Sequence, residues 1–478
     1  MHRIGGGDRR LGHDERIDAV TTRYRLDSSW WRRRSSSSTS GADDTIVAGS
    51  PLRLFRLGAG GSRLADVLES DGTVPPGTES LAERFVEAGV IHPVYEADPS
   101  PPYERVSVIV PVHDEHHGEL SALVATLRSD GFDEIVIVDD GSRYPLAPVD
   151  GALVVRRDSA GGPGVARNTG VAVTTRDAVL FLDADTRWSP GGLGLLWPHF
   201  SDERVAVVAP RVASSDDGGL VATYETDSSP LDLGSEPARV RPSTRVSYVP
   251  AAALLVRRSA FDAVGGFEPS LRFGEDVDFV WQIEREGHIV RYEPSCVVHH
   301  RPRASLGALA RQRFGYGSAA ARLEARHPGA VRPLRINRWS ALGWGLIGVG
   351  HPFVGTAVGV GSTVALAQKL RDTPDRWLVA GRLAGLGNLH AGRLIASAIT
   401  RPWWPIFAVA GVVSRRARRV MLIAAIVPNL WRWSRRKPNI DPIRYVALRV
   451  IDDVSYGAGV WSGVIEERKL DAITPRFD

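Results

Sequence analysis

The feature that most constrains the fold is a set of three short apolar runs between Val106 and Thr186, each followed at once by acidic residues. The runs are VSVIVPV, EIVIV and AVLFL, and they lead into HDE, DDGS and DADT. Short runs rich in Val and Ile are typical of strands buried in a parallel sheet. Because the carboxyl ends of parallel strands meet at one edge of a sheet, the loops after them carry ligand-binding groups. The sequence therefore predicts an α/β domain with a site at that edge.

The loops in this stretch have side chains suited to a charged leaving group and a metal ion. Asp183 and Asp185 stand two residues apart at a strand end, where they can project to the same side and hold Mg²⁺ or Mn²⁺. In GGPGVARNTG the glycines allow close backbone approach, a helix begins, and Arg167 can reach a phosphate. Two plainer interpretations stay open: an Asx turn at the two aspartates, and an arginine that only bridges strand ends.

A second group of polar residues follows Tyr248. Gly274, Glu275 and Asp276 open an apparent helix that continues to Asp278, and three acids in a first turn also simply complement a helix N-terminus. The later run CVVHHRPR ends a strand, and alternation along it allows only one of His299 and His300 to face the site.

The order of the motifs PVHDE, DDGS, ARN and DAD over about 80 residues resembles the nucleotide-binding half of family-2 glycosyltransferases with the GT-A fold. The resemblance implies an inverting, metal-dependent hexosyltransferase in which Asp276 is the general base and Asp185 and His300 bind Mn²⁺ or Mg²⁺. Donor-binding residues implied by it are Pro111, Asp114, Glu115, Asp140, Arg167, Asp183 and Arg313. Those implied for the acceptor are Glu275, Asp278 and Tyr316.

The composition changes before and after this central domain. Residues 1–16 are predicted to be disordered, and residues 17–96 to form a small winged-helix-like domain ahead of a GT-A domain at 103–330. The small domain resembles modules that recognise a peptide by adding it as a strand to their sheet, and a plain accessory domain is the alternative.

This domain order resembles the glycosyltransferases of mycofactocin biosynthesis. It implies transfer of glucose from UDP-glucose to a peptide-derived redox cofactor precursor, premycofactocin, with growth of a β-linked oligoglucoside. A cell-envelope enzyme acting on a lipid-linked or polysaccharide acceptor is the alternative within the same chemistry. A non-enzymatic protein that recruits a peptide to the membrane is another alternative. It is disfavoured because the acidic residues Asp140, Asp183, Asp185 and Asp276 are all present.

Residues 331–440 are predicted to be an apolar and basic helical region, followed by a tail at 441–478. Trp339 to Gln368 contains no Asp, Glu, Lys or Arg, and its Pro and many Gly favour a bent helical pair, with spanning of a bilayer and plain packing left open. From Arg376 to Ile440 there are twelve Lys or Arg and no acid. Tryptophans flank the apolar runs, which favours a membrane interface over nucleic acid.

The remaining composition bears on the compartment. The lone Cys296 excludes a disulfide framework and any zinc site made of cysteines. The sequence has no segment with the pattern of a signal peptide. We therefore expect the protein at the cytoplasmic face of the cell membrane.

Overall fold

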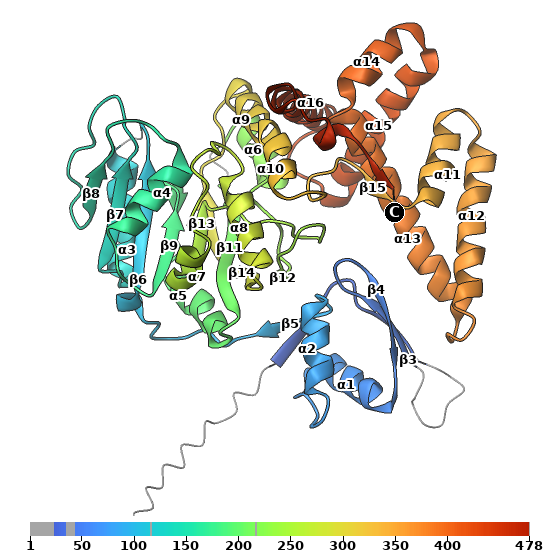
Figure 1. Cartoon of the computed structure of the whole chain (residues 1–478), viewed down its shortest axis with the longest axis horizontal. Coiled ribbons are helices and arrows are strands. Elements are labelled where there is room, and N and C mark those ends of the chain that lie inside the picture. The colour runs from blue at the N-terminus through green and yellow to red at the C-terminus, as the bar shows by residue number, and fades with distance from the viewer. Residues whose placement is uncertain (1–22, 35–43, 115–116, 216–217, 478) are drawn as a thin grey trace, which may run out of the picture.

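The computed structural model describes residues 23–34, 44–114, 117–215 and 218–477. Residues 1–16, predicted to be disordered, and the predicted donor residue Glu115 lie outside these ranges. The described chain forms an N-terminal module, a central sheet with helices on both faces, and a C-terminal set of helices (Figure 1).

The central sheet has nine strands in the order β10-β14-β11-β13-β9-β6-β7-β8, with β12 also paired to β14. Its strands are β6 (Val106–Val112), β7 (Glu134–Asp139), β8 (Leu153–Arg156), β9 (Ala178–Leu182), β10 (Thr186–Arg187), β11 (Val205–Ser214), β12 (Ala238–Arg239), β13 (Ala253–Arg257) and β14 (Ile289–His300). The predicted strands β6, β7 and β9 are parallel to one another, whereas β13 runs antiparallel between β9 and β11. The sheet is therefore mixed, as the GT-A resemblance implies.

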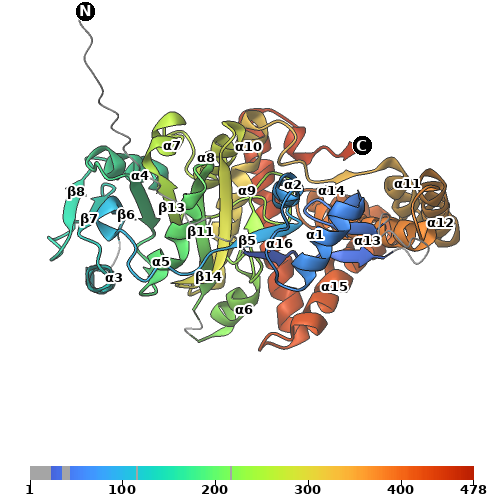
Figure 2. The ribbon, with the colours of Figure 1, turned by 90° about the horizontal axis from the view of Figure 1, so that it is seen from below.

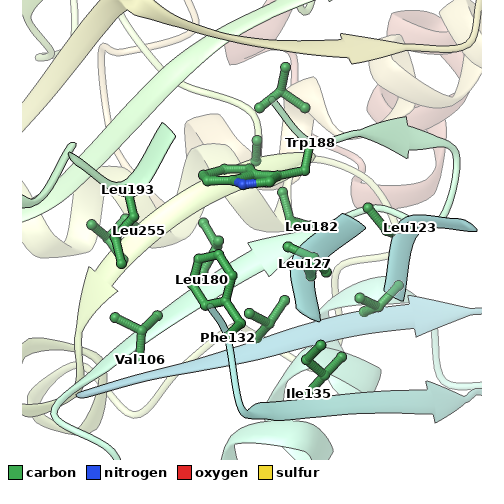
Figure 3. Close-up of a cluster of buried hydrophobic side chains, with 14 of the residues drawn as sticks. Val106, Leu123, Leu127, Phe132, Ile135, Leu180, Leu182, Trp188, Leu193 and Leu255 are labelled. Carbon is green, nitrogen blue, oxygen red and sulfur yellow. The ribbon is translucent and has the colours of Figure 1, made fainter. Parts of the chain in front are cut away.

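Alternation along the strands divides the apolar side chains between two cores. In β9, Leu180 and Leu182 face one core together with Trp188 (Figure 3), while Val179 and Phe181 face the other. The first core is covered by α3 (His117–Asp130) and α5 (Gly192–Leu196), and the second by α4 (Pro163–Ala172), α7 (Arg258–Ala263) and α8 (Glu275–Arg285). Both faces are buried, which explains why these strands read as unbroken apolar runs.

The N-terminal module has its own core. Its three-stranded antiparallel sheet consists of β2 (Trp31–Arg33), β3 (Asp44–Ala48) and β4 (Arg53–Leu57), and β1 (Arg23–Leu26) pairs with β5 (Ile91–Val94). The helices α1 (Ala59–Glu69) and α2 (Glu79–Glu87) pack on this framework. The module therefore combines short antiparallel strands with two helices around one apolar core.

Polar contacts join this module to the rest of the molecule. Arg241 donates to the carbonyl of Glu87 at 2.8 Å, and Arg245 lies 3.3 Å from Asp27. On another side, the guanidinium of Arg382 lies 5.1 Å from the ring centroid of Trp31. Figure 2 accordingly shows the module beside both the central sheet and the C-terminal helices.

Six helices make up most of the C-terminal region. They are α11 (Arg338–Gly348), α12 (Pro352–Lys369), α13 (Arg376–Thr400), α14 (Trp404–Val413), α15 (Arg415–Arg436) and α16 (Pro442–Glu467). The break before Pro352 makes α11 and α12 the bent pair expected from the sequence. Across the described ranges, none of the helices combines the length and apolar character required of a membrane span.

The segment expected as a tail instead contains α16, which crosses α9 (Leu306–Ser318) at very short distance. A Cβ atom added at Gly317, Gly459 or Gly463 would overlap a backbone carbonyl of the other helix. Only glycine permits such an approach, and it brings α16 against the central domain beside α6 (Leu220–Ser228) and α10 (Ala320–Arg326). In addition, the short strand β15 (Arg335–Ile336) pairs in parallel with β16 (Arg476–Phe477) at the end of the described chain.

Candidate active site

A cavity of about 1480 Å³ opens at the carboxyl ends of β6, β7 and β9. Its walls include the predicted residues Pro111, Asp140, Arg167, Asp183, Asp185, Glu275, Asp276, His300, Arg313 and Tyr316. The first turns of α4 and α8 form part of it, and residues of α13, α15 and α16 close another side. Most of the predicted site is therefore brought together in one space.

The loop after β9 presents the acidic pair to a histidine. Asp183 closes a turn through its carbonyl, which accepts from the amide and hydroxyl of Thr186, and Thr186 then pairs with His300 across β10 and β14. This pairing sets Nε2 of His300 3.2 Å from Oδ1 of Asp185. His299, one residue earlier, points to solvent, so His300 is the histidine of the site.

Asp183, Asp185 and His300 form a set of donors suited to a divalent cation. One possible ligand atom from each of the three residues lies within 4.8 Å of the other two. Burial raises the pKa of Asp185, but the hydrogen bond and charge of His300 more than offset it, so the pKa is lowered. Asp185 is thus an anion in the neutral pH range, as a carboxylate ligand of Mg²⁺ or Mn²⁺ must be.

Arg167 links the loop after β9 to α8, the helix that carries the predicted base Asp276. Its guanidinium donates to Asp183 at 2.6 Å and to Glu275 at 3.0 Å, and its side chain is buried. Gly164 allows this packing, because a Cβ there would meet Glu275 and Phe267 at close range. Arg167 therefore bridges two elements, which is the plainer interpretation left open by the sequence, while still lining the cavity.

Asp276 lies on the cavity wall at the start of α8. Its carboxylate accepts from the amides of Val277 at 2.8 Å and Ala251 at 3.4 Å. Burial raises the pKa of Asp276, although Arg167 and these two amides oppose the shift. The pKa of Glu275 is raised too, first by burial and then by the charge of Asp276. Two buried acids with raised pKa values therefore stand next to each other at the start of α8, on the cavity wall.

Asp140 holds the glycine-rich loop in place. Its carboxylate accepts from the amides of Gly161 at 3.0 Å and Gly162 at 2.7 Å, and it pairs with Arg157. Asp114 has a left-handed backbone with φ of 55° and accepts from the amide of Arg143 at 2.8 Å. It is directed to this neighbouring turn and is not part of the cavity wall, in contrast to the donor contact expected of it.

Asp278, expected at the acceptor, is fully buried and faces away from the cavity. Its carboxylate accepts from Arg326 at 2.6 Å and lies 2.7 Å from Nε2 of His327. The reason is helical geometry, since a residue two positions after Asp276 lies on the opposite side of α8. Asp278 therefore anchors α8 on the C-terminal end of α10.

Arg313, expected at the diphosphate, is held by two carboxylates. Its Nε donates to Asp452 of α16 at 3.0 Å and an Nη donates to Glu225 of α6 at 3.0 Å, and only 2% of the residue is exposed. The guanidinium borders the cavity, but its strongest bonds join α9 to α6 and α16.

Several lining residues were not predicted from the sequence. Arg272 lies beside Gly162, and within the described residues it has no ion-pair partner. Tyr248, Arg401 and Tyr456 complete the side opposite the donor loops. The sequence could have indicated Arg272 as a site residue, because it directly precedes the Phe-Gly-Glu-Asp stretch. No local pattern marks Arg401 or Tyr456, which reach the site through helix packing.

Comparison with known proteins places the chain in a family. Residues 107–265 match the family model described as glycosyl transferase family 2. A pre-mycofactocin glycosyltransferase of Mycobacterium tuberculosis (strain ATCC 25618 / H37Rv) is 38% identical over 459 residues, which cover 91% of this chain and 95% of that relative. An N-acetylglucosaminyl-diphospho-decaprenol L-rhamnosyltransferase of the same strain is 31% identical over 150 residues, covering 27% of this chain and 49% of the relative.

A solved mannosyltransferase from Pyrobaculum calidifontis, in complex with GDP-Man and Mn²⁺, aligns with 16% identity and a TM-score of 0.37, covering 78% of this chain and 92% of that one. The mixed sheet and the family match define a glycosyltransferase of the GT-A fold. The chain belongs to glycosyltransferase family 2, and its similarity to the pre-mycofactocin glycosyltransferase extends over nearly the whole of both proteins.

Proposed function

We propose that this glycosyltransferase moves glucose from UDP-glucose onto premycofactocin, a peptide-derived redox cofactor precursor, and extends a β-linked oligoglucoside. The observation that carries the proposal is the 38% identity over 91% of the chain to a protein named for glycosylation of pre-mycofactocin. The cavity supports it, because its volume of about 1480 Å³ exceeds the roughly 300 to 1,000 Å³ of a typical small-molecule pocket. A donor and an acceptor can therefore bind together.

The proposed reaction is a single displacement with inversion at the anomeric carbon. Asp276 accepts the proton of an acceptor hydroxyl while that oxygen forms a bond to the anomeric carbon. The bond from the anomeric carbon to the diphosphate oxygen breaks, and UDP leaves with the bonding electrons. Asp276 is the only side chain that must take a proton, since no covalent intermediate with the protein is formed.

The donor is proposed to lie along the loops after β6, β7 and β9. Asp140 fixes the glycine-rich loop, whose backbone at the start of α4 lies close to the diphosphate, and Arg272 offers a cation beside that loop. Asp183, Asp185 and His300 would hold Mn²⁺ or Mg²⁺. A divalent cation bound there supplies charge stabilisation for the departing diphosphate.

We further propose that the C-terminal helices rest on the surface of a membrane, at its cytoplasmic face. Apolar side chains stand exposed on α12, α14 and α15, with Phe353 at 89% and Val413 at 88% exposure. Arg415, Arg416 and Arg418 begin α15 beside this apolar surface, in a region without acidic residues. Apolar side chains bordered by arginines match an anionic lipid interface.

The proposed function is tested by incubating the purified full-length enzyme with a panel of UDP-sugars, Mn²⁺ or Mg²⁺, and three acceptors: premycofactocin, a lipid-linked sugar and a polysaccharide. Mass spectrometry is expected to detect a hexose ladder on premycofactocin with UDP-glucose. A ladder on the lipid-linked or polysaccharide acceptor alone would favour the cell-envelope alternative, and absence of UDP release with every donor would contradict the enzymatic proposal.

A further inference from the structure

Two arginines lie opposite each other where the N-terminal module meets the central sheet. Arg239 of β12 and Arg291 of β14 are directly paired in register, so their side chains stand next to each other on one face of the sheet. Neither is among the described residues that line the large cavity. The module covers this place, because Arg241 donates to the carbonyl of Glu87 at the end of α2. The two arginines are therefore enclosed between two parts of the chain.

Arg291 is a buried cation without an ion-pair partner among the described residues. Only 4% of the residue is exposed, and its Nε and Nη1 atoms have no hydrogen-bond partner there. Burial lowers the pKa of Arg291 to about 10, and while Tyr95 opposes this shift, the charge of Arg239 adds to it. A charge buried without a partner costs folding free energy, so this position favours binding of an anion.

The acidic residues closest to this pair already have partners. Glu87 forms an ion pair with Arg239 but leaves the Nε atom of that arginine without a hydrogen bond from the described chain. Asp202 accepts two hydrogen bonds from Arg204, both at 2.9 Å. Asp202 and Glu87 act on the pKa of Arg291 through their charge, but neither forms an ion pair with it in the described part of the chain.

Arg241 adds a third cation to the junction. Among the described residues its guanidinium donates only to a backbone carbonyl, that of Glu87. Its pKa is lowered first by burial and then by the charge of Arg239, and Arg53 of β4 contributes to the same shift, while Glu284 and Glu87 oppose it. Of the three sheet arginines described here, only Arg239 has a carboxylate at ion-pair distance, so positive charge is in excess.

A small cavity of about 10 Å³ adjoins Arg239 and Arg241 on the side of the module. Asp27, His92 and Arg245 line it too, and Asp27 is occupied by both of its neighbours, at 3.0 Å from His92 and 3.3 Å from Arg245. The volume corresponds to about one water molecule. An anion larger than this has to occupy the place of a movable side chain.

We propose that this junction binds a phosphate group between Arg239 and Arg291, and that the phosphate takes the place of the Glu87 carboxylate. A tetrahedral phosphate has enough oxygen atoms to accept hydrogen bonds from both guanidinium groups, and arginine suits such oxyanions by its charge and planar shape.

The side chain of Glu87 is 44% exposed, so it can turn into solvent. Burial raises the pKa of Tyr24 in β1, and the charge of Arg291 acts against this rise, which agrees with a short separation of the two groups. A phosphate on Arg291 would therefore contact the module as well as the sheet and hold the two together. The inference is independent of the sugar donor and of the acceptor.

The test measures thermal unfolding of the full-length protein in phosphate and in sodium chloride of equal ionic strength, with EDTA present to keep metal ions from binding phosphate in the large cavity. Phosphate should raise the Tm of the wild type by about 2 °C or more. Arg291→Met should abolish this rise and, without phosphate, should have an unchanged or higher Tm, because a buried unpaired charge is removed.

Glu87→Gln distinguishes the proposed site from general effects of salt. The substitution removes the competing carboxylate, so the rise in Tm should reach half of its maximum at about threefold lower phosphate concentration. Inorganic phosphate and glycerol 3-phosphate are compared in the same assay. A larger effect of the ester would identify a phosphate monoester as the natural ligand, and a larger effect of the inorganic ion would identify free phosphate.

Arg25→Met and Arg272→Met are the matched controls. Arg25 also joins the module to the central domain, through Glu236 at 3.1 Å, and Arg272 belongs to the large cavity. Both variants should keep the phosphate effect. If Arg291→Met does not fold, Arg239→Gln replaces it and should weaken the effect.

Three results would overturn the proposal. They are an unchanged Tm of the wild type in phosphate, an equal rise in the wild type and the variant at the junction, and loss of the rise in Arg272→Met, which would place the phosphate in the large cavity. None of these results bears on glycosyl transfer, since no sugar nucleotide is present in the assay.

Discussion

Carboxylates that look alike in the sequence have different tasks because their neighbours differ. Asp276 is buried at the cavity wall, and burial raises its pKa more than the hydrogen bonds from the amides of Val277 and Ala251 lower it. Burial also acts on Asp278, but His327 and Arg326 outweigh it and lower that pKa. One helix therefore carries two aspartates, two residues apart, whose pKa values are shifted in opposite directions.

Replacement of the base should separate binding from transfer. We expect Asp276→Asn to bind UDP-glucose with the wild-type Kd but to lose at least about 100-fold in kcat, the usual contribution of a general base. Because the pKa of Asp276 is raised, the wild-type kcat/KM should rise with pH through a value above the ordinary aspartate range. Calorimetric titration and a pH profile measure these effects, and normal turnover by the variant would contradict the assignment.

Arg313 and Arg272 both line the cavity but differ in their ion pairs, so substitutions at the two positions should have opposite effects on stability and donor binding. Arg313→Met removes the guanidinium that pairs with buried Glu225 and Asp452, and we expect a cost of about 3 kcal/mol of unfolding free energy, because Asp452 keeps the hydroxyl of Tyr224 and Arg401. Arg272→Met breaks no ion pair among the described residues, so we expect an unchanged Tm and a raised KM for UDP-glucose. Thermal unfolding and donor kinetics of both variants make the comparison. A stable Arg313→Met enzyme with only a donor defect would restore Arg313 as the diphosphate contact.

At the scale of elements, the crossing of α9 and α16 positions one side of the site. The crossing depends on Gly317, Gly459 and Gly463, whose missing side chains let the two backbones touch. Through it Asp452 reaches Arg313, and Tyr456 reaches the cavity. The helix α16 is therefore a structural part of the catalytic domain.

Addition of one methyl group should test this packing. Gly459→Ala would place a Cβ on the carbonyl of Phe314, and we expect a loss of roughly 1 to 3 kcal/mol in unfolding free energy together with lower activity. Gly381→Ala on α13 adds a Cβ that meets no atom within 4 Å, so better helix propensity should make it neutral or stabilising. Equal unfolding midpoints for the two variants in urea would show that the close crossing is not required.

The sequence was informative where function depends on neighbouring residues and uninformative where it depends on packing. The motifs after β6, β7 and β9 predicted the cavity because strand ends in a parallel sheet converge. Alternation in β14 predicted that one of His299 and His300 faces the site, and the family resemblance pointed to His300. The partners of Arg313 could not be predicted, since Asp452 lies 139 residues away and no local pattern links them. The prediction placed Asp278 at the acceptor because the neighbouring acids in the first turn of α8 were treated as one group.

At the scale of the whole molecule, the apolar side chains of α12, α14 and α15 stand apart from the cavity. Exposed positions on α14 and α15 include Val409, Val412, Val413, Leu422 and Ile423. The N-terminal module contacts both the catalytic domain and α13, so it fixes the orientation of these parts in one body. A membrane contact through the C-terminal helices would hold the cavity at a constant angle to the lipid.

Membrane binding is expected to respond to salt and to apolar surface separately. The full-length protein should pellet with vesicles containing phosphatidylserine at low ionic strength and be released in part by high salt, because the arginines of α15 contribute through charge. A double variant, Val409→Ser and Val413→Ser, should bind more weakly at every salt concentration, while Val173→Ser on the exposed end of α4 should not. Complete recovery of the wild type in the supernatant at low salt would contradict the membrane proposal.

The pairing of Arg313 with Asp452 also means that the cavity is assembled in steps while the ribosome synthesises the chain. Once α9 has been made, Arg313 can pair with Glu225 of α6, but Asp452 reaches Arg313 only after α16 has been made. The part of the cavity wall formed by Arg401 and Tyr456 is absent for as long as those residues are untranslated. A nascent or prematurely terminated chain can thus have the loops after β6, β7 and β9 in place while the opposite part of the cavity wall is still missing.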